Sequence, residues 1–290
     1  MTTIAVTGAT GQLGRLIVAA LLDRGVPAQN VIAAVRTPEK AADLAARGVQ
    51  VRHADYARPE TLASALQGAE RVLLISGTPG DRVRHHANVV DAAKQAGVKL
   101  IAYTGVLNAD TTTMLLAADH QATEQLIKDS RLPYAFLRNG WYTENYLMEL
   151  EATLTHGFAG ASGQGRFTPA ARVDFAEAAA AVLTGHGHET NVAYELGGDA
   201  ALTMDEMAAL LGDATGKSIA YTDMPVEEYA AVLTRAGLPE LVAEVLADAS
   251  AAVGRGELFT DSGDLQRLLG RAATPVKTTF EQALAAGAVA

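Results

Sequence analysis

The first half of the chain alternates short apolar runs with longer amphipathic stretches, and Gly, Pro or Asp separates one from the next. Runs rich in β-branched residues predict strands, whereas apolar positions at helical spacing predict helices. This alternation favours a parallel sheet, since each helix carries the chain back to begin the next strand. The predicted strands are Ile4 to Thr7, Val31 to Val35, Val49 to His53, Val72 to Ser76, Leu100 to Tyr103 and Tyr134 to Leu137. The predicted helices are Gln12 to Arg24, Pro38 to Arg47, Pro59 to Leu66, Arg82 to Ala96 and Ala117 to Ser130.

Several of these strands are continuously apolar, as in Val72-Leu73-Leu74-Ile75. Such runs suit strands that helices cover on both faces. We therefore predict the α/β class, with a Rossmann-like doubly wound parallel sheet and a smaller, mostly helical C-terminal domain.

The pattern loosens after about Arg138, which indicates a change of domain. We expect one domain over residues 1–138 and a smaller lobe over residues 139–290, with about 166–200 returning to the first domain. The predicted elements of this half are strands Ala193 to Leu196 and Ser218 to Thr222, helices Met204 to Thr215 and Val226 to Ala236, a glycine-rich loop at Gly157 to Gly165 and a mostly helical tail from Glu240 to Ala290.

Composition and charge narrow the class of protein. Of the 290 residues, 49% are hydrophobic and 19% charged, which excludes disordered and collagen-like chains. No apolar stretch reaches the about 20 residues that a membrane span needs, and the N-terminus lacks the order of a signal peptide. Cys is absent, which removes thiol catalysis and disulfides and fits a reducing cytoplasm. The net charge of −10 and the lack of a basic cluster argue against nucleic acid as a partner.

A glycine-rich turn follows the first predicted strand. Gly8, Ala9, Thr10, Gly11, Gln12, Leu13 and Gly14 form a GxxGxxG arrangement that leads directly into a predicted helix. Glycines let the backbone turn tightly and approach a pyrophosphate, and the helix N-terminus offers N–H groups and a positive dipole end. The order of strand, glycine turn and helix therefore predicts dinucleotide binding.

Residues at the ends of the later strands indicate which nucleotide binds. Arg36 follows the second strand, where an Asp or Glu would hold the ribose of NAD and an Arg meets the 2′-phosphate of NADP. Lys40 lies four residues further on and adds a second candidate cation. Ser76, Gly77 and Thr78 close the fourth strand at the edge where ligands bind in such folds. The sequence thus favours NADPH over NADH.

Other catalytic motifs are missing or incomplete. No Tyr has Lys four residues on, and the helix that should hold a Tyr-x-x-x-Lys pair has Leu116 and His120 at those positions. Neither a zinc-protease motif nor a nucleophile elbow occurs, and we expect no metal. We interpret His85-His86 and the pair His186 and His188 as solvated loop or helix-end residues. The P-loop-like stretch from Gly212 to Ser218 lacks a residue between its glycines and is interpreted as a helix stop.

Taken together, these motifs resemble those of a known family. Gly8 to Gly14, the strand ending in Arg36, the run Leu100 to Thr104, and above all Leu137-Arg138-Asn139-Gly140-Trp141-Tyr142-Thr143-Glu144-Asn145-Tyr146 are similar to the NmrA-like atypical short-chain dehydrogenases. Within that family the chain resembles the bacterial NADPH:quinone oxidoreductases and the related triphenylmethane dye reductases. His120 with Glu124, and Ala171-Arg172-Val173-Asp174, extend the likeness over nearly the whole chain.

The resemblance implies an NADPH-binding domain, a small C-terminal domain and a substrate cleft between them. It also implies that the missing Tyr-x-x-x-Lys pair is typical of this group. The cofactor contacts that it implies are Gly8, Ala9, Thr10, Gly11, Gln12, Leu13, Arg36, Ser76, Gly77, Thr78, Asn139, Gly140, Trp141, Tyr142, Thr143, Glu144 and Arg172.

A quinone already accepts hydride readily, because its ring system delocalises the arriving charge. Such an acceptor needs to be held against nicotinamide C4 more than it needs a tuned acid. We expect Trp141 and Tyr142 to form an aromatic wall for the substrate, Asn139 to position the nicotinamide or a quinone oxygen, and His120 to line the cleft and donate a proton from a pKa near neutrality. The catalytic candidates are thus His120, Asn139 and Tyr142.

Two alternatives stay open from the sequence. Triarylmethane or azo dyes differ from quinones only in the pocket shape that they need. A redox sensor would bind NADP(H) without turning it over. A homodimer is also expected.

Overall fold

The computed structural model describes residues 2–77, 80–185 and 190–286. The chain forms two compact units, the first made of residues 1–106, 119–139 and 173–194 and the second of residues 107–118, 140–172 and 195–290. The sequence analysis placed one change of domain after residue 138 and a return over about 166–200. No pattern in the sequence indicated that residues 107–118 would cross to the second unit.

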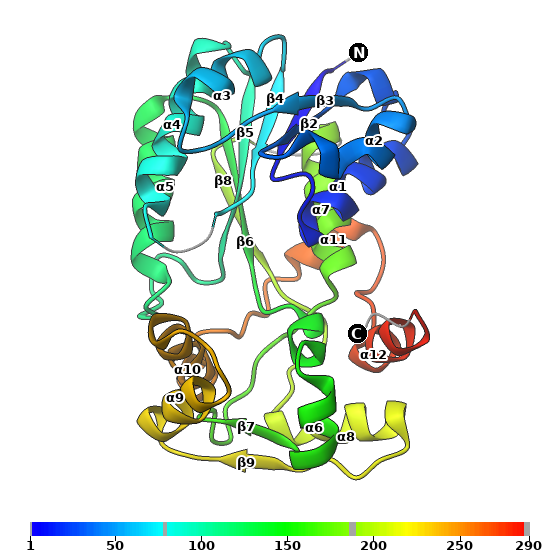
Figure 1. Cartoon of the computed structure of the whole chain (residues 1–290), viewed down its shortest axis with the longest axis vertical. Coiled ribbons are helices and arrows are strands. Elements are labelled where there is room, and N and C mark those ends of the chain that lie inside the picture. The colour runs from blue at the N-terminus through cyan, green and yellow to red at the C-terminus, as the bar shows by residue number, and fades with distance from the viewer. Residues whose placement is uncertain (1, 78–79, 186–189, 287–290) are drawn as a thin grey trace. The chain divides into compact units, whose positions relative to one another are not determined.

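A seven-stranded sheet forms the centre of the first unit (Figure 1). Its strand order is β3-β2-β1-β4-β5-β6-β8, and the neighbouring pairs from β3 to β6 are parallel. The predicted Rossmann-like doubly wound sheet is confirmed, with its reversal of strand order between β1 and β4. The strands are β1 (Ile4–Thr7), β2 (Val31–Val35), β3 (Gln50–His53), β4 (Arg71–Leu74), β5 (Leu100–Val106), β6 (Tyr134–Asn139) and β8 (Val192–Leu196).

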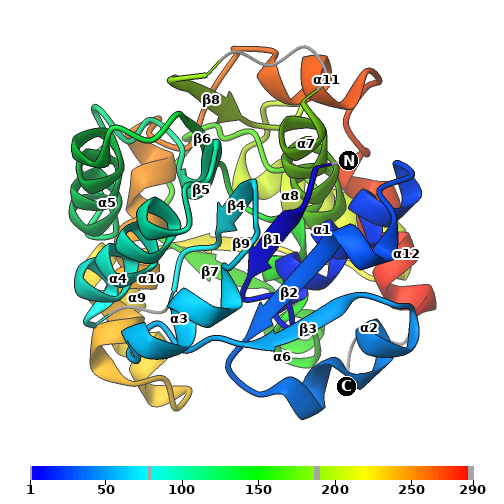
Figure 2. The same ribbon diagram turned by 90° about the horizontal axis from the view of Figure 1, so that it is seen from above.

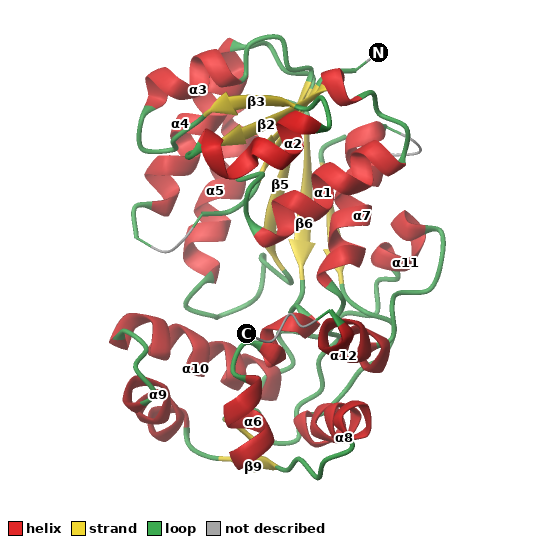
Figure 3. Cartoon of the chain, turned by 45° about the vertical axis from the view of Figure 1, so that its right-hand side comes forward, coloured by secondary structure: helices red, strands yellow, loops and turns green. Residues whose placement is uncertain are grey.

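Helices cover both faces of this sheet, as Figures 2 and 3 show. Helices α3, α4 and α5 lie on one face, where Leu62, Val89 and Ile127 pack with strand side chains in a buried cluster. Helices α1 and α7 lie on the other, where Ile17 and Leu21 of α1 are fully buried. The elements are α1 (Gln12–Asp23), η1 (Ala28–Asn30), η2 (Pro38–Ala41), α2 (Ala42–Ala46), α3 (Pro59–Ala65), α4 (Arg82–Gln95), α5 (Ala117–Ser130) and α7 (Arg172–Thr184).

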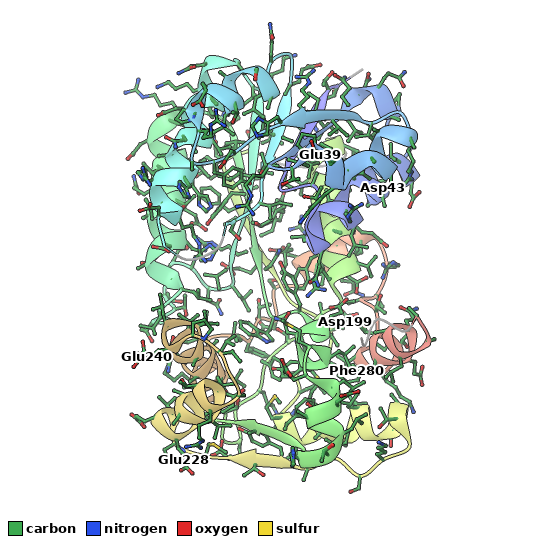
Figure 4. All side chains as sticks on the ribbon, in the orientation of Figure 1. Glu39, Asp43, Asp199, Glu228, Glu240 and Phe280 are labelled. Carbon is green, nitrogen blue, oxygen red and sulfur yellow. The ribbon has the colours of Figure 1, made fainter. Side chains whose placement is uncertain are left out.

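The second unit is mostly helical, as predicted, and contains a two-stranded parallel sheet of β7 and β9. The prediction that residues 157–165 form only a loop is wrong, because Phe158–Gly160 pairs with Tyr221–Asp223. Gly216 ends α8 in the left-handed conformation, which confirms the helix stop. Phe280 of α12 is fully buried (Figure 4). The elements are η3 (Thr143–Leu147), α6 (Leu150–His156), β7 (Phe158–Gly160), α8 (Met204–Thr215), β9 (Tyr221–Asp223), α9 (Val226–Arg235), α10 (Glu240–Gly254), α11 (Asp264–Leu269) and α12 (Val276–Ala285).

None of the described helices is long and apolar enough to cross a membrane.

Candidate functional site

The glycine turn lies at the carboxyl end of β1, next to the reversal of strand order. Gly8 adopts a left-handed φ of +61°, and the Gly11 N–H donates to the Gly8 carbonyl at 2.9 Å. A Cβ on Gly14 would lie 2.3 Å from the Gly8 oxygen, so only glycine lets α1 approach β1 this closely. No side chain caps α1 at Gly11, which leaves its first N–H groups to a ligand. This turn therefore fits a pyrophosphate.

The end of β2 provides the cations that sequence analysis assigned to the 2′-phosphate. Thr7 pairs with Ala34, so Gly8 and Arg36 leave the sheet at the same edge. Arg36 and Lys40 are both exposed. Their exposure leaves these two side chains accessible to a charged ligand.

Arg15 is a further cation at this edge that sequence analysis missed. From the first turn of α1, it donates one hydrogen bond to the Asp43 carboxylate at 2.5 Å and another to the Lys40 carbonyl. The hydrogen bond from Arg15 lowers the pKa of Asp43. Figure 4 labels Asp43 on α2, in the segment that follows Arg36. The signal in the sequence was an Arg directly after the third glycine, where the helix faces the end of the next strand.

The turn after β4 is held by side chains from several elements. Thr7 Oγ1 accepts from the Ile75 N–H at 3.1 Å, and the Tyr56 hydroxyl donates to the Ile75 carbonyl at 2.9 Å. The Ser76 N–H donates to Thr104 Oγ1 at 2.8 Å. The turn thus has a fixed backbone at the edge that the sequence assigned to the cofactor. Thr78, which was predicted with Ser76 and Gly77, lies outside the described residues.

Helix α4 completes this turn with two buried polar residues. The Gly77 N–H donates to His86 Nε2 at 3.0 Å, and Arg82 Nε donates to the Gly77 carbonyl at 2.9 Å. The interpretation of His86 as a solvated residue is wrong, since its side chain is 0% exposed. Its place on the buried face of α4, four residues after Arg82, is the signal that could have found it. His186 and His188 lie outside the described residues.

His120 lies on α5, and its Nδ1 is 2.7 Å from the hydroxyl of the buried Tyr103. Burial, with smaller contributions from Arg82 and His86, lowers the pKa of His120 to about 3. Burial also raises the pKa of Tyr103. The expected pKa near neutrality is therefore wrong, and His120 is neutral at physiological pH.

Glu124, four residues after His120, forms a buried ion pair with Arg138. Arg138 Nε and an Arg138 terminal nitrogen donate to the two Glu124 oxygens at 2.8 and 2.6 Å. His120, Thr123, Glu124 and Ile127 are all buried, and their spacing places them on one face of α5. Glu124 thus fixes the strand residue that precedes Asn139.

Asn139 ends β6 in the first unit and is buried. Several other predicted site residues belong to the same unit: Gly8 to Leu13, Arg36, Ser76, Gly77 and His120. The register of β5 and β6 pairs Asn139 with Val106 at their carboxyl ends. Asn139 therefore leaves the sheet at the same edge as the cofactor turns.

The other predicted residues, Gly140 to Glu144 and Arg172, belong to the second unit and come together there. The Glu144 carboxylate accepts from the Arg172 N–H at 2.9 and 3.0 Å, at the start of α7. The Arg172 guanidinium lies 5.0 Å from the centre of the half-buried Tyr142 ring. The Thr143 N–H donates to the Ala170 carbonyl at 2.9 Å. Arg172 thus places a positive charge on one face of the predicted aromatic wall.

Among the described residues, no group of three His, Asp or Glu side chains could hold a metal ion.

Comparison with known proteins identifies relatives over nearly the whole chain. The model of the NmrA-like family matches residues 1–282. Quinone oxidoreductase 2 of Escherichia coli (strain K12) is 48% identical over 273 residues, which are 93% of this chain and 95% of the relative.

Two solved structures have the same fold. The NADPH-dependent quinone oxidoreductase of Escherichia coli, complexed with NADPH, has a TM-score of 0.93 and 45% identity, covering 97% of this chain and 100% of the other. The triphenylmethane reductase of Citrobacter sp., complexed with NADP(H), has a TM-score of 0.91 and 44% identity, covering 97% of this chain and 100% of the other.

Proposed function

This chain belongs to the NmrA-like family, and from that membership and its site we propose that it is an NADPH-dependent oxidoreductase that transfers hydride to a quinone. The observation that carries the proposal is the 48% identity, over 93% of the chain, to quinone oxidoreductase 2. The first unit supports it with a glycine turn for the pyrophosphate and with Arg36 at the end of β2.

NADPH fits the residues of the first unit. The uncapped N-terminus of α1 would hold the pyrophosphate, and Arg36 would hold the 2′-phosphate through a charge-assisted hydrogen bond. Arg15 adds positive charge near by and holds the segment that follows Arg36 in place. The bound nicotinamide supplies the hydride.

The protein contributes position more than acid catalysis. No Tyr-x-x-x-Lys pair is present, and His120, with a pKa of about 3, holds no spare proton at neutral pH. We assign His120 to the wall of the acceptor site and Asn139 to the positioning of the nicotinamide or of a quinone oxygen. The quinol then takes its proton from water. The residues of the site would then act mainly by holding the acceptor within near-attack distance of the hydride donor, in general about 3 to 3.5 Å.

The acceptor faces Trp141 and Tyr142 in this proposal. Reduction of a quinone builds negative charge on its oxygens, and Arg172 beside Tyr142 stabilises such charge. A cationic triarylmethane dye lacks this benefit and meets a like charge. The site therefore favours a quinone over a cationic dye. Reduction of triarylmethane or azo dyes is the second candidate function, because the chain is similar to triphenylmethane reductase.

The location in the cell and the oligomeric state also belong to the proposal. The absence of Cys supports a cytoplasmic setting. The homodimer stays a prediction.

The proposal is tested by measuring the oxidation of NADPH by purified protein, with and without a small naphthoquinone. We expect oxidation that depends on the quinone and that is much faster with NADPH than with NADH. Protein that binds NADPH tightly but reduces neither quinones nor dyes would identify a redox sensor instead.

A further inference from the structure

The turn after β4 is unusual because side chains, and not neighbouring strands, satisfy its backbone. Residues Ile75 to Gly77 lie beyond the last residue of β4, Leu74. The N–H groups of all three residues donate to side chains. The carbonyls of Ile75 and Gly77 accept hydrogen bonds from side chains. The shape of the turn therefore depends on a few buried polar residues.

Among the described partners of this turn, His86 is the one whose acceptor atom loses its lone pair when it takes up a proton, whereas the Thr7 and Thr104 hydroxyls accept and donate at the same time. Its Nε2 accepts from the Gly77 N–H at 3.0 Å, so that nitrogen bears no proton. A neutral imidazole then has its proton on Nδ1, which lies 2.9 Å from Thr123 Oγ1. Thr123 Oγ1 in turn donates to the Asp119 carbonyl at 2.8 Å, which leaves its lone pairs free to accept from His86. Thr123 therefore fixes the tautomer that Gly77 requires.

The surroundings of His86 keep it uncharged. The side chain is fully buried, and the Arg82 guanidinium from the same helix lies at the same turn. Burial and the charge of Arg82 lower the pKa of His86 to about 3. A charged imidazole would turn Nε2 into a donor and oppose the Gly77 N–H. Helix α5 brings one carboxylate close to Arg82, that of Asp119, at 3.5 Å.

The held turn also adjoins the glycine turn of β1. A Cβ on Gly8 would meet Ile75 Cβ at 3.7 Å and the Tyr56 hydroxyl at 3.9 Å. A Cβ on Gly77 would meet His86 Nε2 and the Tyr56 ring at 3.8 Å. Tyr56 therefore lies beside both Gly8 and Gly77, and the first residue of the held turn, Ile75, also contacts the glycine turn. The two turns flank the reversal of strand order, where ligands bind in doubly wound folds.

We propose that His86 is a positioning residue for the cofactor: by accepting the Gly77 N–H in the tautomer that Thr123 fixes, it holds the turn after β4 in the shape that receives NADPH. This inference rests on the proposed function for the identity of the nucleotide. His86 touches neither substrate nor cofactor in this role and acts through Gly77.

Two amide substitutions place their polar groups at the two different ring-nitrogen positions of His86 and so test the hydrogen bond to Gly77. Gln places its amide oxygen where His has Nε2, so His86→Gln keeps the acceptor for Gly77. Asn reaches only as far as Nδ1, so His86→Asn keeps the contact with Thr123 and leaves the Gly77 N–H unpaired. An unpaired buried N–H costs about 1–3 kcal/mol, or roughly 5- to 150-fold in an equilibrium constant. His85→Asn, at the half-buried neighbour, is the matched control.

The measurement is NADPH affinity by titration calorimetry, with the unfolding temperature of each nucleotide-free variant measured beside it. We expect His86→Asn to bind NADPH at least tenfold more weakly than wild type, and His86→Gln and His85→Asn to stay within about threefold. Folded His86→Asn protein with wild-type affinity overturns the proposal. So does a His86→Gln variant that binds as weakly as His86→Asn, because the acceptor that Gln keeps for the Gly77 N–H would then make no difference.

Nitrogen-15 NMR of labelled histidine in the nucleotide-free protein provides a second readout. We expect His86 to show an unprotonated Nε2 and a protonated Nδ1 from pH 5 to 8, and Thr123→Val to disturb that pattern. The opposite tautomer in wild type overturns the inference. Wild-type protein that binds NADPH but reduces no acceptor contradicts the proposed function alone and leaves the His86 comparison valid.

Discussion

In our proposal, the choice of nucleotide depends on Arg36. It is exposed and follows β2 at the edge where the glycine turn leaves β1. Arg36→Ala removes the charge that meets the 2′-phosphate, which NADH lacks. We expect the KM for NADPH to rise by tenfold or more, since a hydrogen bond to a charged group contributes about 1.5–3 kcal/mol, while the KM for NADH changes little. Equal weakening of both nucleotides would contradict the assignment, and Glu39→Ala in the same segment is the control.

Glu124 and Arg138 form the buried ion pair that fixes the strand leading to Asn139. Their side chains are only 3% and 4% exposed. Glu124→Gln removes the charge of a buried carboxylate that pairs with the Arg138 guanidinium, and we expect the free energy of unfolding to fall by about 3–5 kcal/mol. Urea denaturation measures this loss. The control is Glu60→Gln, which breaks an exposed ion pair with Arg58 and should leave the urea midpoint unchanged. An equally small effect of Glu124→Gln would show that the ion pair of Glu124 with Arg138 is not needed for stability.

Single residues were predicted from the sequence only where a motif fixes their chemistry. Gly8 and Arg36 were predicted because glycine turns and phosphate-binding arginines occupy set places after strands. The partner of Arg15 and the place of His86 depend on which helix packs on which strand. The lowered pKa of His120 likewise depends on burial, which the spacing of residues along a helix indicates only in part.

At the scale of the element, Gly14 decides how closely α1 packs on β1. Its Cβ would lie 2.3 Å from the Gly8 oxygen and 2.8 Å from Ala9 Cα, and both neighbours are backbone. We expect Gly14→Ala to lower the free energy of unfolding by about 1–3 kcal/mol and to weaken NADPH binding, because the helix must move. Gly216→Ala has open space around it but a φ of +70°, so it should cost about 1 kcal/mol and leave NADPH binding intact.

Thermal unfolding and calorimetric titration of the two glycine variants check this comparison. Undiminished NADPH affinity in Gly14→Ala would contradict the account of the glycine turn.

Most elements of the first unit were predicted from periodicity, because buried parallel strands and amphipathic helices leave strong patterns. Strand β7 was missed because it is only three residues long and ends in glycine. Its partner β9 was predicted as Ser218 to Thr222 and lies at Tyr221–Asp223. The place of residues 107–118 was missed for another reason. Asn108 donates to the carbonyls of Glu257 and Phe259, and such contacts between distant residues leave no local pattern.

At the scale of the whole molecule, two buried histidines make stability depend on pH. The pKa values of His86 and His120 are lowered to about 3 from 6.5. Below pH 6.5 the unfolded chain therefore binds protons that the folded protein does not, and stability falls as the pH decreases. Each histidine contributes a slope of up to about 1.4 kcal/mol per pH unit.

Urea denaturation between pH 7.5 and about 5 tests this dependence. Carboxylates such as Glu257 contribute to the pH dependence of stability mainly below this pH range, because the pKa of Glu257 is lowered to about 2 from 4.5. We expect His86→Gln to reduce the slope by about half. A wild-type stability that is constant down to pH 5 would show that these histidines are not buried in neutral form.

The central claim is that this chain passes hydride from NADPH directly to a quinone without a side-chain acid, and a single turnover without oxygen tests it most directly. Protein loaded with one equivalent of NADPH is mixed with one equivalent of a naphthoquinone, and nicotinamide absorbance, quinol and radical signal are followed together. We predict one quinol for each NADPH consumed, no semiquinone, and slower transfer when C4 of the nicotinamide bears deuterium. Persistence of NADPH beside unreduced quinone, or the build-up of a semiquinone, would contradict the account.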